Sequence, residues 1–294
     1  MASLRDIRRR IRSVRSTAQI TKAMELVAAS RMRRAQLRVL ASRPYAEAMN
    51  AMIRQLGLAR KEGEALHPLL QQRATHHRVG LIMLTTDRGL CGALNTNLIR
   101  RGTEFLLGAE QEQEMELVTV GRKGQDFMAR RGRAIRATFT HLGDRPEYMS
   151  IVPIARVVVD DFESGRIDAA YLLYPKFIST LAQRPQIDQL LPIAPPAETA
   201  PGGQRAAEYI YEPDPRAILD ELLPRYVEVQ IFQSVLETIA SEQSARMVAM
   251  RAANDNAKEL IDGLTLTYNR ARQAAITAEV NEIASAANAM ALRE

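Results

Sequence analysis

Tryptophan is absent from this chain of 294 residues, cysteine occurs once, histidine occurs four times, and aromatic residues make up only 5%. Because Cys91 is alone, no internal disulfide can form, which fits a reducing compartment, and we expect it to be a small buried residue. The histidines show no metal-ligand spacing, since His76 and His77 are adjacent while His67 and His141 are isolated. The sequence therefore predicts no metal site.

Motifs for membrane spans, nucleotide binding and catalysis are also missing. The longest apolar stretches have about ten residues, short of the twenty or so that cross a bilayer. Two glycine-containing turns, at residues 86–92 and 121–124, lack the GxGxxG and GK[ST] patterns of nucleotide sites, so we interpret them as structural turns. There is no G-x-S-x-G motif, and we interpret Asp160 and Asp161 as solvated charge near a helix end. We predict no catalytic residue, no cofactor and no direct nucleotide binding.

Glycine and proline, which interrupt helices, are scarce in the two terminal parts of the chain. Residues 4–56 contain only Pro44, and residues 216–290 contain only Gly263 and Pro224. At about 1.5 Å per residue, helices over these segments would be roughly 80 and 110 Å long, far longer than the helices of an ordinary globular domain. We predict that they form a shaft, with a bend or a short break at each proline.

Both terminal segments also carry small or apolar residues at alternating steps of four and three, which is typical of a coiled-coil seam. The first seam consists of Ile7, Ile11, Val14, Ala18, Thr21, Glu25, Ala28, Met32, Ala35, Val39, Ser42, Ala46, Met49 and Ile53. The second seam consists of Leu222, Tyr226, Val229, Gln233, Leu236, Ala240, Gln243, Met247, Met250, Asn254, Ala257, Ile261, Leu264, Tyr268, Ala271, Ala275 and Ala278. Because many of these residues are alanine or polar, each seam buries little apolar area, and neither helix should be stable alone. We therefore predict that the two helices pair antiparallel.

The middle of the chain changes to short apolar runs separated by turn residues. Strands are predicted at 79–85, 117–120, 134–139, 169–174 and 187–191, and helices at 95–106, 123–131 and 154–164. A last short strand is expected at 209–211, after a loose linker at 194–204. This alternation predicts a Rossmann-like α/β domain with a mainly parallel sheet.

The predicted fold class is therefore α/β, in which a long antiparallel two-helix coiled coil accompanies the central domain. We expect three parts: a coiled-coil helix over 1–57, the α/β domain over 75–212, and a second coiled-coil helix over 213–294 that packs against the first. Asp214 is a good N-cap and Pro215 a good first residue for the second helix.

Positive charge is concentrated near the N-terminus. The net charge is +6, but residues 1–38 hold eleven Lys or Arg against only Asp6 and Glu25. Such a basic collar can bind nucleic acid, anionic lipid or an acidic protein surface. It contains no aromatic residue that could stack on bases, which favours an acidic protein partner. A basic coiled-coil protein that binds nucleic acid is the alternative, and an enzyme built on the α/β domain is a third interpretation.

The motifs in these segments resemble the gamma subunit of F-type ATP synthase along essentially the whole chain. Near the N-terminus the matching stretches are DIR at 6–8, ITKAMELVAASRM at 20–32 and SRPYA at 42–46. In the middle they are TDRGLCG at 86–92, KFI at 176–178 and QLLP at 189–192. Towards the C-terminus they are YEPD at 211–214, SEQSARMVAM at 241–250, YNRARQ at 268–273 and ITAEVNE at 276–282. The chain departs from the family at Ala286, where the family has glycine, and we expect a stiffer helix tip there.

The resemblance implies a non-catalytic central rotor that couples ion flow through the membrane sector to ATP synthesis or hydrolysis. Its implied partners are the ring of alpha and beta subunits, the epsilon subunit and the membrane c-ring, with membrane association through the complex only. A transit peptide is an alternative interpretation of MASLRDIRRRIRSVRS, but the first seam already runs through Ile7, Ile11 and Val14 in phase with its later positions. We therefore expect a bacterial protein on the cytoplasmic face of the inner membrane.

The resemblance also implies which residues contact the surrounding ring. These residues are Arg8, Arg9, Met24, Glu25, Arg33, Arg246, Gln273, Thr277, Glu279 and Glu282. Met24 and its neighbours are expected to share one contact region with Arg246 and with the residues near the C-terminus, while the basic collar faces acidic loops of the beta subunits. The small apolar tip at 283–290 would turn in an apolar bearing. Glu25 falls on the first seam, and matching the two chain ends gives an antiparallel register in which paired residue numbers sum to about 299. We therefore predict that Glu25 pairs with Arg270 and Arg272.

Overall fold

The computed structural model describes residues 3–58, 67–73, 77–109, 113–193 and 215–291. The chain divides into two compact units. Unit 1 consists of Met1–Val27 and Met247–Glu294, and unit 2 consists of Ala28–Arg246. Two long helices, α1 at Leu4–Leu58 and α5 at Pro215–Ala291, contribute to both units.

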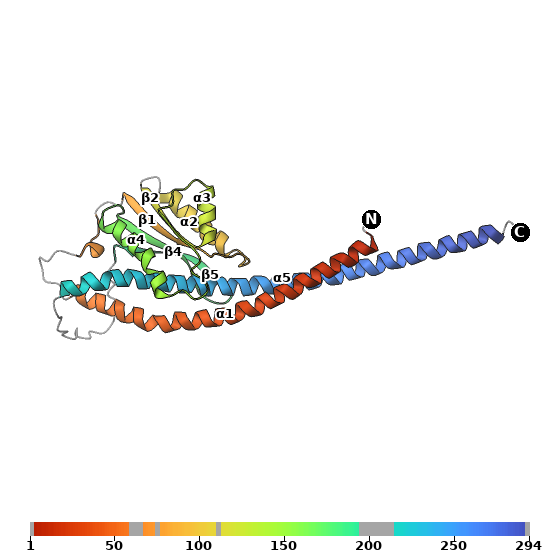
Figure 1. Ribbon diagram of the computed structural model, residues 1–294, viewed down its shortest axis with the longest axis horizontal. Helices are drawn as coiled ribbons and strands as arrows, with labels where there is room; N and C mark the ends of the chain where they lie inside the picture. The colour runs from red at the N-terminus through yellow and green to blue at the C-terminus, as the bar shows by residue number, and fades with distance from the viewer. Residues whose placement is uncertain (1–2, 59–66, 74–76, 110–112, 194–214, 292–294) are drawn as a thin grey trace. The chain divides into compact units, whose positions relative to one another are not determined.

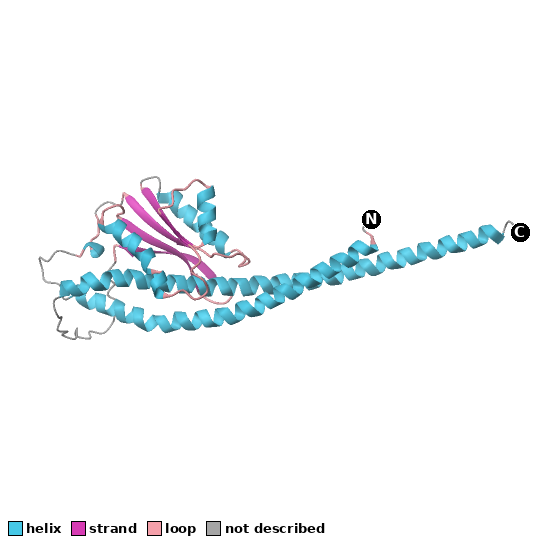
Figure 2. Cartoon of the chain, viewed as in Figure 1, coloured by secondary structure: helices cyan, strands magenta, loops and turns pink. Residues whose placement is uncertain are grey.

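Unit 2 holds a five-stranded sheet with helices on both faces (Figures 1 and 2). The strands are β1 Arg78–Leu84, β2 Glu114–Val120, β3 Ala137–Phe139, β4 Ala169–Phe177 and β5 Gln183–Leu191. The helices between them are α2 Leu94–Ala109, α3 Arg122–Arg130 and α4 Val152–Glu163, with short 3-10 turns at Pro68–Leu70 and Tyr148–Ser150. The eight central strands and helices expected from the sequence at residues 79–191 are all present, with ends shifted by a few residues.

The strand order is β3-β2-β1-β4-β5, in which β1 pairs in parallel with β2 and β4, and β2 pairs in parallel with β3. Only β5 is antiparallel, joined to β4 by a tight hairpin. The prediction of a mainly parallel sheet is thus confirmed. Since β1 lies at the centre and six of its seven residues are buried, its apolar sequence RVGLIML follows from cover on both faces.

Alternate residues of the strands point into two separate cores, as the pleat requires. Leu81 and Met83 of β1 pack with α2 and α3 on one face. Ile82 and Leu84 pack on the other face with α4 and with the parts of α1 and α5 that belong to unit 2. Along α5, Leu223, Val227 and Ile231 are fully buried in this second core, together with Met49 and Ile53 of α1. The helix pair is therefore the third layer of unit 2.

A buried carboxylate fixes the edge of the sheet where β1 and β4 begin. Asp168 accepts hydrogen bonds from the Arg73 guanidinium at 2.7 Å and from the backbone amides of His77 and Arg78, both at 2.9 Å. Burial alone would raise the pKa of Asp168, but these hydrogen bonds and the Arg73 charge lower it. Arg73 also lies over the Phe162 ring, with 4.9 Å between the guanidinium carbon and the ring centroid. Asp168 thus joins the start of the sheet to the end of α4.

Neither proline interrupts its helix, because α1 continues through Pro44 and α5 through Pro224. Of the two alternatives expected at these positions, a bend or a short break, the continuous helices exclude the break. Packing explains why the helices persist, since Ala46 and Met49 follow Pro44 and both are buried, as are Leu223 and Val227 beside Pro224. The strand expected at 209–211, the linker at 194–204 and the N-cap Asp214 lie outside the described residues.

In unit 1 the N-terminal half of α1 and the C-terminal part of α5 run antiparallel. Arg8 donates a hydrogen bond to the Tyr268 hydroxyl at 2.5 Å, and Arg251 donates one to Glu25 at 3.1 Å. Both pairs place residue n of α1 opposite residue 276 − n of α5. The buried side chains fall on the two predicted seams, and they are Ile7, Ala18, Thr21, Glu25, Met250, Asn254 and Ala257. The predicted antiparallel coiled coil is confirmed.

Candidate functional site

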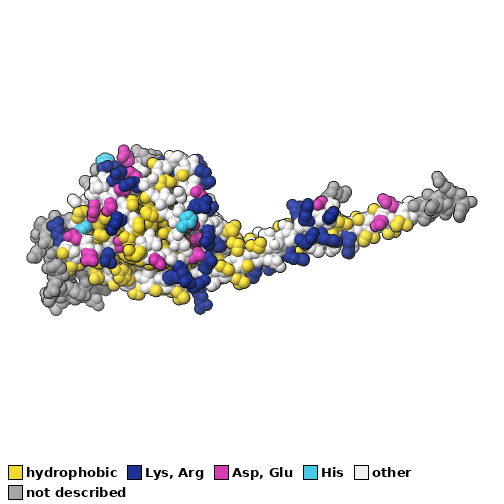
Figure 3. Space-filling model, in the orientation of Figure 1, with side chains coloured by type: hydrophobic (Ala, Val, Ile, Leu, Met, Phe, Trp, Pro, Cys, Tyr) yellow, Lys and Arg dark blue, Asp and Glu magenta, His cyan; other side chains and the backbone are white. Residues whose placement is uncertain are grey.

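The first turns of α1 form a strongly basic surface. Arg5, Arg8, Arg9, Arg10, Arg12 and Arg15 are all exposed in unit 1. Asp6 is the only acidic residue among them, and it pairs with Arg9 at 3.0 Å. A hydrogen bond from the Ser3 hydroxyl lowers the pKa of the Asp6 carboxyl, and the charge of Arg9 lowers it further. Arg8 bonds to Tyr268, and the other arginines face solvent, so dark blue gathers over the start of α1 in Figure 3. Such a surface can attract an acidic partner.

Glu25 is buried in the seam between the two helices of unit 1. Its carboxylate accepts a hydrogen bond from Lys22 at 3.0 Å and one from Arg251 at 3.1 Å. These two cationic partners, Lys22 first, lower the pKa of Glu25. Glu25 does pair with an arginine of the opposite helix, as predicted, but that arginine is Arg251. The predicted partners Arg270 and Arg272 were wrong. Matching the two chain ends shifted the register by 23 residues, because α5 continues well beyond the start of α1.

The continuation of α5 is an exposed single helix. By the register above, Leu4 of α1 lies opposite Arg272, and every described side chain from Arg272 to Ser285 is exposed. The predicted contact residues in this stretch are Gln273, Thr277, Glu279 and Glu282. Ile276, Val280 and Ile283, which are large exposed apolar residues, stand among and directly after them. Such a surface, apolar and acidic side by side, suits contact with another protein.

Unit 1 spreads the predicted contact residues along the helix pair rather than gathering them. Met24 is half-buried near Glu25, whereas Gln273 lies beyond the start of α1, some 20 residues further along the register. The residues expected to form a single contact region around Met24 therefore lie at separate positions along the length of the helix pair. Of the two predicted contact residues in unit 2, Arg33 is exposed and Arg246 is buried.

Arg246 joins α5 to the loop that follows β1. Its guanidinium donates to the Gly89 carbonyl at 3.1 Å and to Glu242 at 2.5 Å. Burial raises the pKa of Glu242, although the charge of Arg246 opposes that rise. Because Arg246 is only 7% exposed, it positions the loop within this chain. Sequence reasoning gave it a contact role and missed this internal one.

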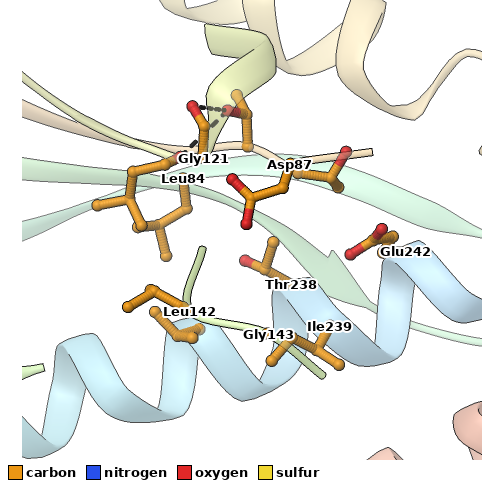
Figure 4. Close-up of a pocket in the computed structure, with 12 residues that line it drawn as sticks. Leu84, Asp87, Gly121, Leu142, Gly143, Thr238, Ile239 and Glu242 are labelled. Carbon is orange, nitrogen blue, oxygen red and sulfur yellow. Dashed lines mark hydrogen bonds between the residues drawn. The ribbon is translucent and has the colours of Figure 1, made fainter. Parts of the chain in front are cut away.

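A small cavity opens at the carboxyl ends of β1 and β2, where a ligand site would be expected in an α/β sheet. It is lined by Thr85, Thr86 and Asp87 after β1, by Gly121 after β2, and by Thr238 and Glu242 of α5, which rise toward it from below in Figure 4. The cavity volume is about 40 Å³, whereas ligand pockets usually have about 300–1,000 Å³. It has room for a few water molecules only.

Hydrogen bonds within the chain hold the two glycine-containing turns to each other and to neighbouring residues. Asp87 accepts hydrogen bonds from the amide of Arg122 at 3.0 Å and from the amide of His141 at 2.9 Å. Asn95 donates to Thr86 at 2.8 Å. This geometry supports the interpretation of both turns as structural. Cys91 is buried beside them, and burial, with the nearby Glu242 carboxylate, raises the pKa of its thiol.

Neither a metal-ligating cluster nor a spanning helix occurs in the described part of the chain. No group of three or more His, Cys, Asp or Glu side chains is arranged to hold a metal ion there. No helix among the described residues is long and apolar enough to cross a membrane.

Comparisons with known proteins agree with this picture. The family described as ATP synthase matches residues 3–290. The ATP synthase gamma chain of Dehalococcoides mccartyi strain BAV1 is 50% identical over 291 residues, which cover 99% of this chain and all of that protein. The gamma chain of Roseiflexus castenholzii is 52% identical over 292 residues, 99% of each chain.

Solved structures show the same fold at lower identity. A chain from the Euglena gracilis mitochondrial ATP synthase, OSCP/F1/c-ring in rotational state 3, has a TM-score of 0.68 and 21% identity, covering 98% of this chain and 94% of that chain. A chain from the rotor of the same complex in rotational state 1 has a TM-score of 0.64, 20% identity and coverage of 93% and 98%.

Proposed function

The chain belongs to the ATP synthase gamma-chain family, and from this premise we propose that it turns as the central rotor of a rotary, F-type ATP synthase. The observation that carries the proposal is the exposed, single-helix end of α5, which continues past the antiparallel pair of unit 1. Ile276, Val280 and Ile283 are exposed. Contact with a surrounding protein that removes these side chains from water is therefore favourable. A ring of alpha and beta subunits supplies such contact.

The rotor acts without chemistry of its own. The cavity at the sheet edge is too small for a nucleotide, and the turns that line it are held by internal hydrogen bonds. We infer that catalysis belongs to other subunits, that no cofactor is bound, and that the N-terminal segment 1–57 and the C-terminal segment 213–294 are the working parts that accompany the central domain at 75–212. The membrane is reached through the complex, on its cytoplasmic face, with the epsilon subunit and c-ring as further partners.

Coupling follows from differential contact. The surface of unit 1 differs around its axis, because exposed arginines crowd the α1 side of the helix pair while Glu259 and Asp262 are exposed on the α5 side at the same level. As the shaft turns, each beta subunit meets a different part of this surface, so the rotor angle stabilises a different conformation in each. The proposed contact residues for this are Arg8, Arg9, Met24, Arg33, Gln273, Thr277, Glu279 and Glu282, while the buried Glu25 and Arg246 contribute by holding the helix pair and the loop after β1 in place.

Affinity purification tests the proposal. The chain is tagged at a surface loop of unit 2, recovered from its native host under mild detergent, and the bound proteins are identified by mass spectrometry. We expect alpha, beta and epsilon subunits together with the c-ring, and ATP hydrolysis in the purified complex. Recovery of nucleic acid or of unrelated proteins, with no alpha or beta subunit, would refute the rotor.

A further inference from the structure

A segment of unit 2 crosses the helix pair like a strap. We define the strap as residues 140–150, which join β3 to α4. Leu142 and Gly143 line the same cavity as Thr238 and Ile239 of α5, and Figure 4 shows them passing over that helix. His141 and Gly143 have φ angles of 62° and 74°, so the backbone turns sharply where the strap leaves the sheet. The strap is therefore a shaped connection between the sheet and α5.

Asp144 of the strap bonds to both long helices. One carboxylate oxygen accepts from Gln243 of α5 at 3.1 Å, and the other forms an ion pair with Arg31 of α1. Its backbone carbonyl accepts a further hydrogen bond from Arg38 of α1 at 3.2 Å. Arg31 and Asp144 are half-buried, which leaves the ion pair less screened than a fully exposed one. A single residue thus joins α1, α5 and the sheet domain.

Both ends of the strap are fastened as well. At its start, the amide of His141 donates to Asp87, which belongs to the loop after β1. Near its end, the Tyr148 hydroxyl donates to Glu228 of α5, and the Tyr148 ring packs edge-on against Phe232 with 5.7 Å between ring centroids. The strap therefore grips α5 at two levels, at residues 228–232 and at residue 243.

The helices need this fastening because the seam beneath Asp144 is made of small and polar residues. Ala28 and Ala35 of α1 are buried there, as are Ala240 and Gln243 of α5. Small side chains let helices approach closely but interlock little, so they resist sliding and twisting less than large apolar side chains do. A polar connection with directed hydrogen bonds supplies the missing resistance.

Resting on the proposed function, we propose that Asp144 is a positioning residue that locks α1 to α5, so that the shaft transmits torque without slipping when it works against load. Asp144 touches neither nucleotide nor the surrounding ring in this role. It acts through the two helices that it joins. Weakening it leaves unloaded ATP hydrolysis intact and impairs work against an ion gradient.

The test uses the whole complex in inverted membrane vesicles. Asp144→Asn removes the charge but keeps the shape, and Asp126→Asn is the matched control, because Asp126 is an exposed carboxylate of α3 paired with Arg122 away from the helix pair. We measure ATP hydrolysis with an uncoupler present, and ion pumping per ATP as the gradient builds. We expect Asp144→Asn to hydrolyse ATP at the normal uncoupled rate but to lose about twofold to tenfold in pumping per ATP near the maximal gradient. Asp126→Asn should match the unaltered complex in both.

A charge-swapped variant separates positioning from general stability. Combining Arg31→Asp with Asp144→Arg restores an ion pair of opposite polarity, so pumping under load should recover relative to either single variant. Normal pumping by Asp144→Asn at every gradient would overturn the proposal, as would a uniform loss of hydrolysis and pumping that the double variant does not relieve. If Asp144→Asn fails to assemble, the proposal is judged from pumping under load by the double variant, compared with Arg31→Asp and with the unaltered complex. Failure of the rotor itself is distinguishable, since the unaltered chain would then not co-purify with alpha and beta subunits.

Discussion

Replacing Gly121 with alanine tests the backbone geometry at the carboxyl ends of β1 and β2 quantitatively. Gly121 stands between β2 and α3 with φ of 91° and ψ of 140°, a backbone conformation open essentially to glycine alone. A Cβ added there would lie 2.1 Å from the Thr85 carbonyl oxygen and 2.6 Å from its carbonyl carbon. Ordinary carbon–oxygen contacts are about 3.3 Å, so Gly121→Ala must push β1 and β2 apart by about 1 Å.

The cost can be built up from the contacts that this shift disturbs. The left-handed backbone costs alanine about 1–3 kcal/mol. Gly121 also donates to the Phe139 carbonyl at 2.8 Å, and Thr85 donates to the Val120 carbonyl at 2.8 Å. Losing one or two of these hydrogen bonds adds about 1 kcal/mol each. We expect Gly121→Ala to lower the free energy of unfolding by about 2–5 kcal/mol in total, against about 5–15 kcal/mol for a typical domain.

Urea unfolding followed by circular dichroism measures this loss, with Gly108→Ala as the matched control. Gly108 lies in the last turn of α2, and a Cβ added to it meets nothing within 4 Å. Alanine should therefore leave stability unchanged or raise it by up to about 1 kcal/mol. If both variants unfold at the same urea concentration as the original chain, the backbone geometry at Gly121 and the reasoning built on it are refuted.

Three further predictions concern single side chains. Glu25→Gln should destabilise the helix pair by about 1 kcal/mol at pH 7, since its two cationic partners are largely exposed. Because the folded pKa of Glu25 is lowered, its contribution is present above the unfolded pKa of about 4.3 and is lost as pH falls through the folded value, so the unfolding curves of the two proteins should converge at acidic pH. Asp168→Ala should lower the free energy of unfolding by about 3 kcal/mol in urea titrations, because it leaves Arg73 and two backbone amides without their acceptor. Cys91 should resist maleimide at pH 7 in the native chain and react fully in urea, and rapid labelling of the native chain would contradict its burial and raised pKa.

The sequence predicts most of this fold because its patterns are local. The apolar run at Arg78–Leu84 gives β1, and the alternating steps of four and three give the seam that buries Ala18, Thr21 and Glu25. These features depend on which residues share a face, and that is readable from spacing. The mainly parallel sheet follows from the order of strands and helices.

What the sequence leaves open is register and long-range pairing. Spacing shows that Glu25 lies on a seam, but it does not show how far α5 is displaced along α1, and so the partner Arg251 could not be chosen over Arg270. Asp144 was missed for a similar reason, since its partners Arg31 and Gln243 are about 100 residues away on either side. The one local signal was Gly143 before it, which marks a sharp turn.

Cross-linking the helix end tests the central claim most directly. Gln273→Cys places a thiol on the exposed continuation of α5, while the native Cys91 is buried. In the purified complex this thiol is joined to a neighbouring beta subunit through a cleavable disulfide reagent, and ATP hydrolysis is measured before and after reduction. A turning shaft predicts that hydrolysis stops in proportion to the cross-link and returns when the link is reduced. Full hydrolysis in a completely cross-linked complex would show that the shaft need not turn, and would contradict the account.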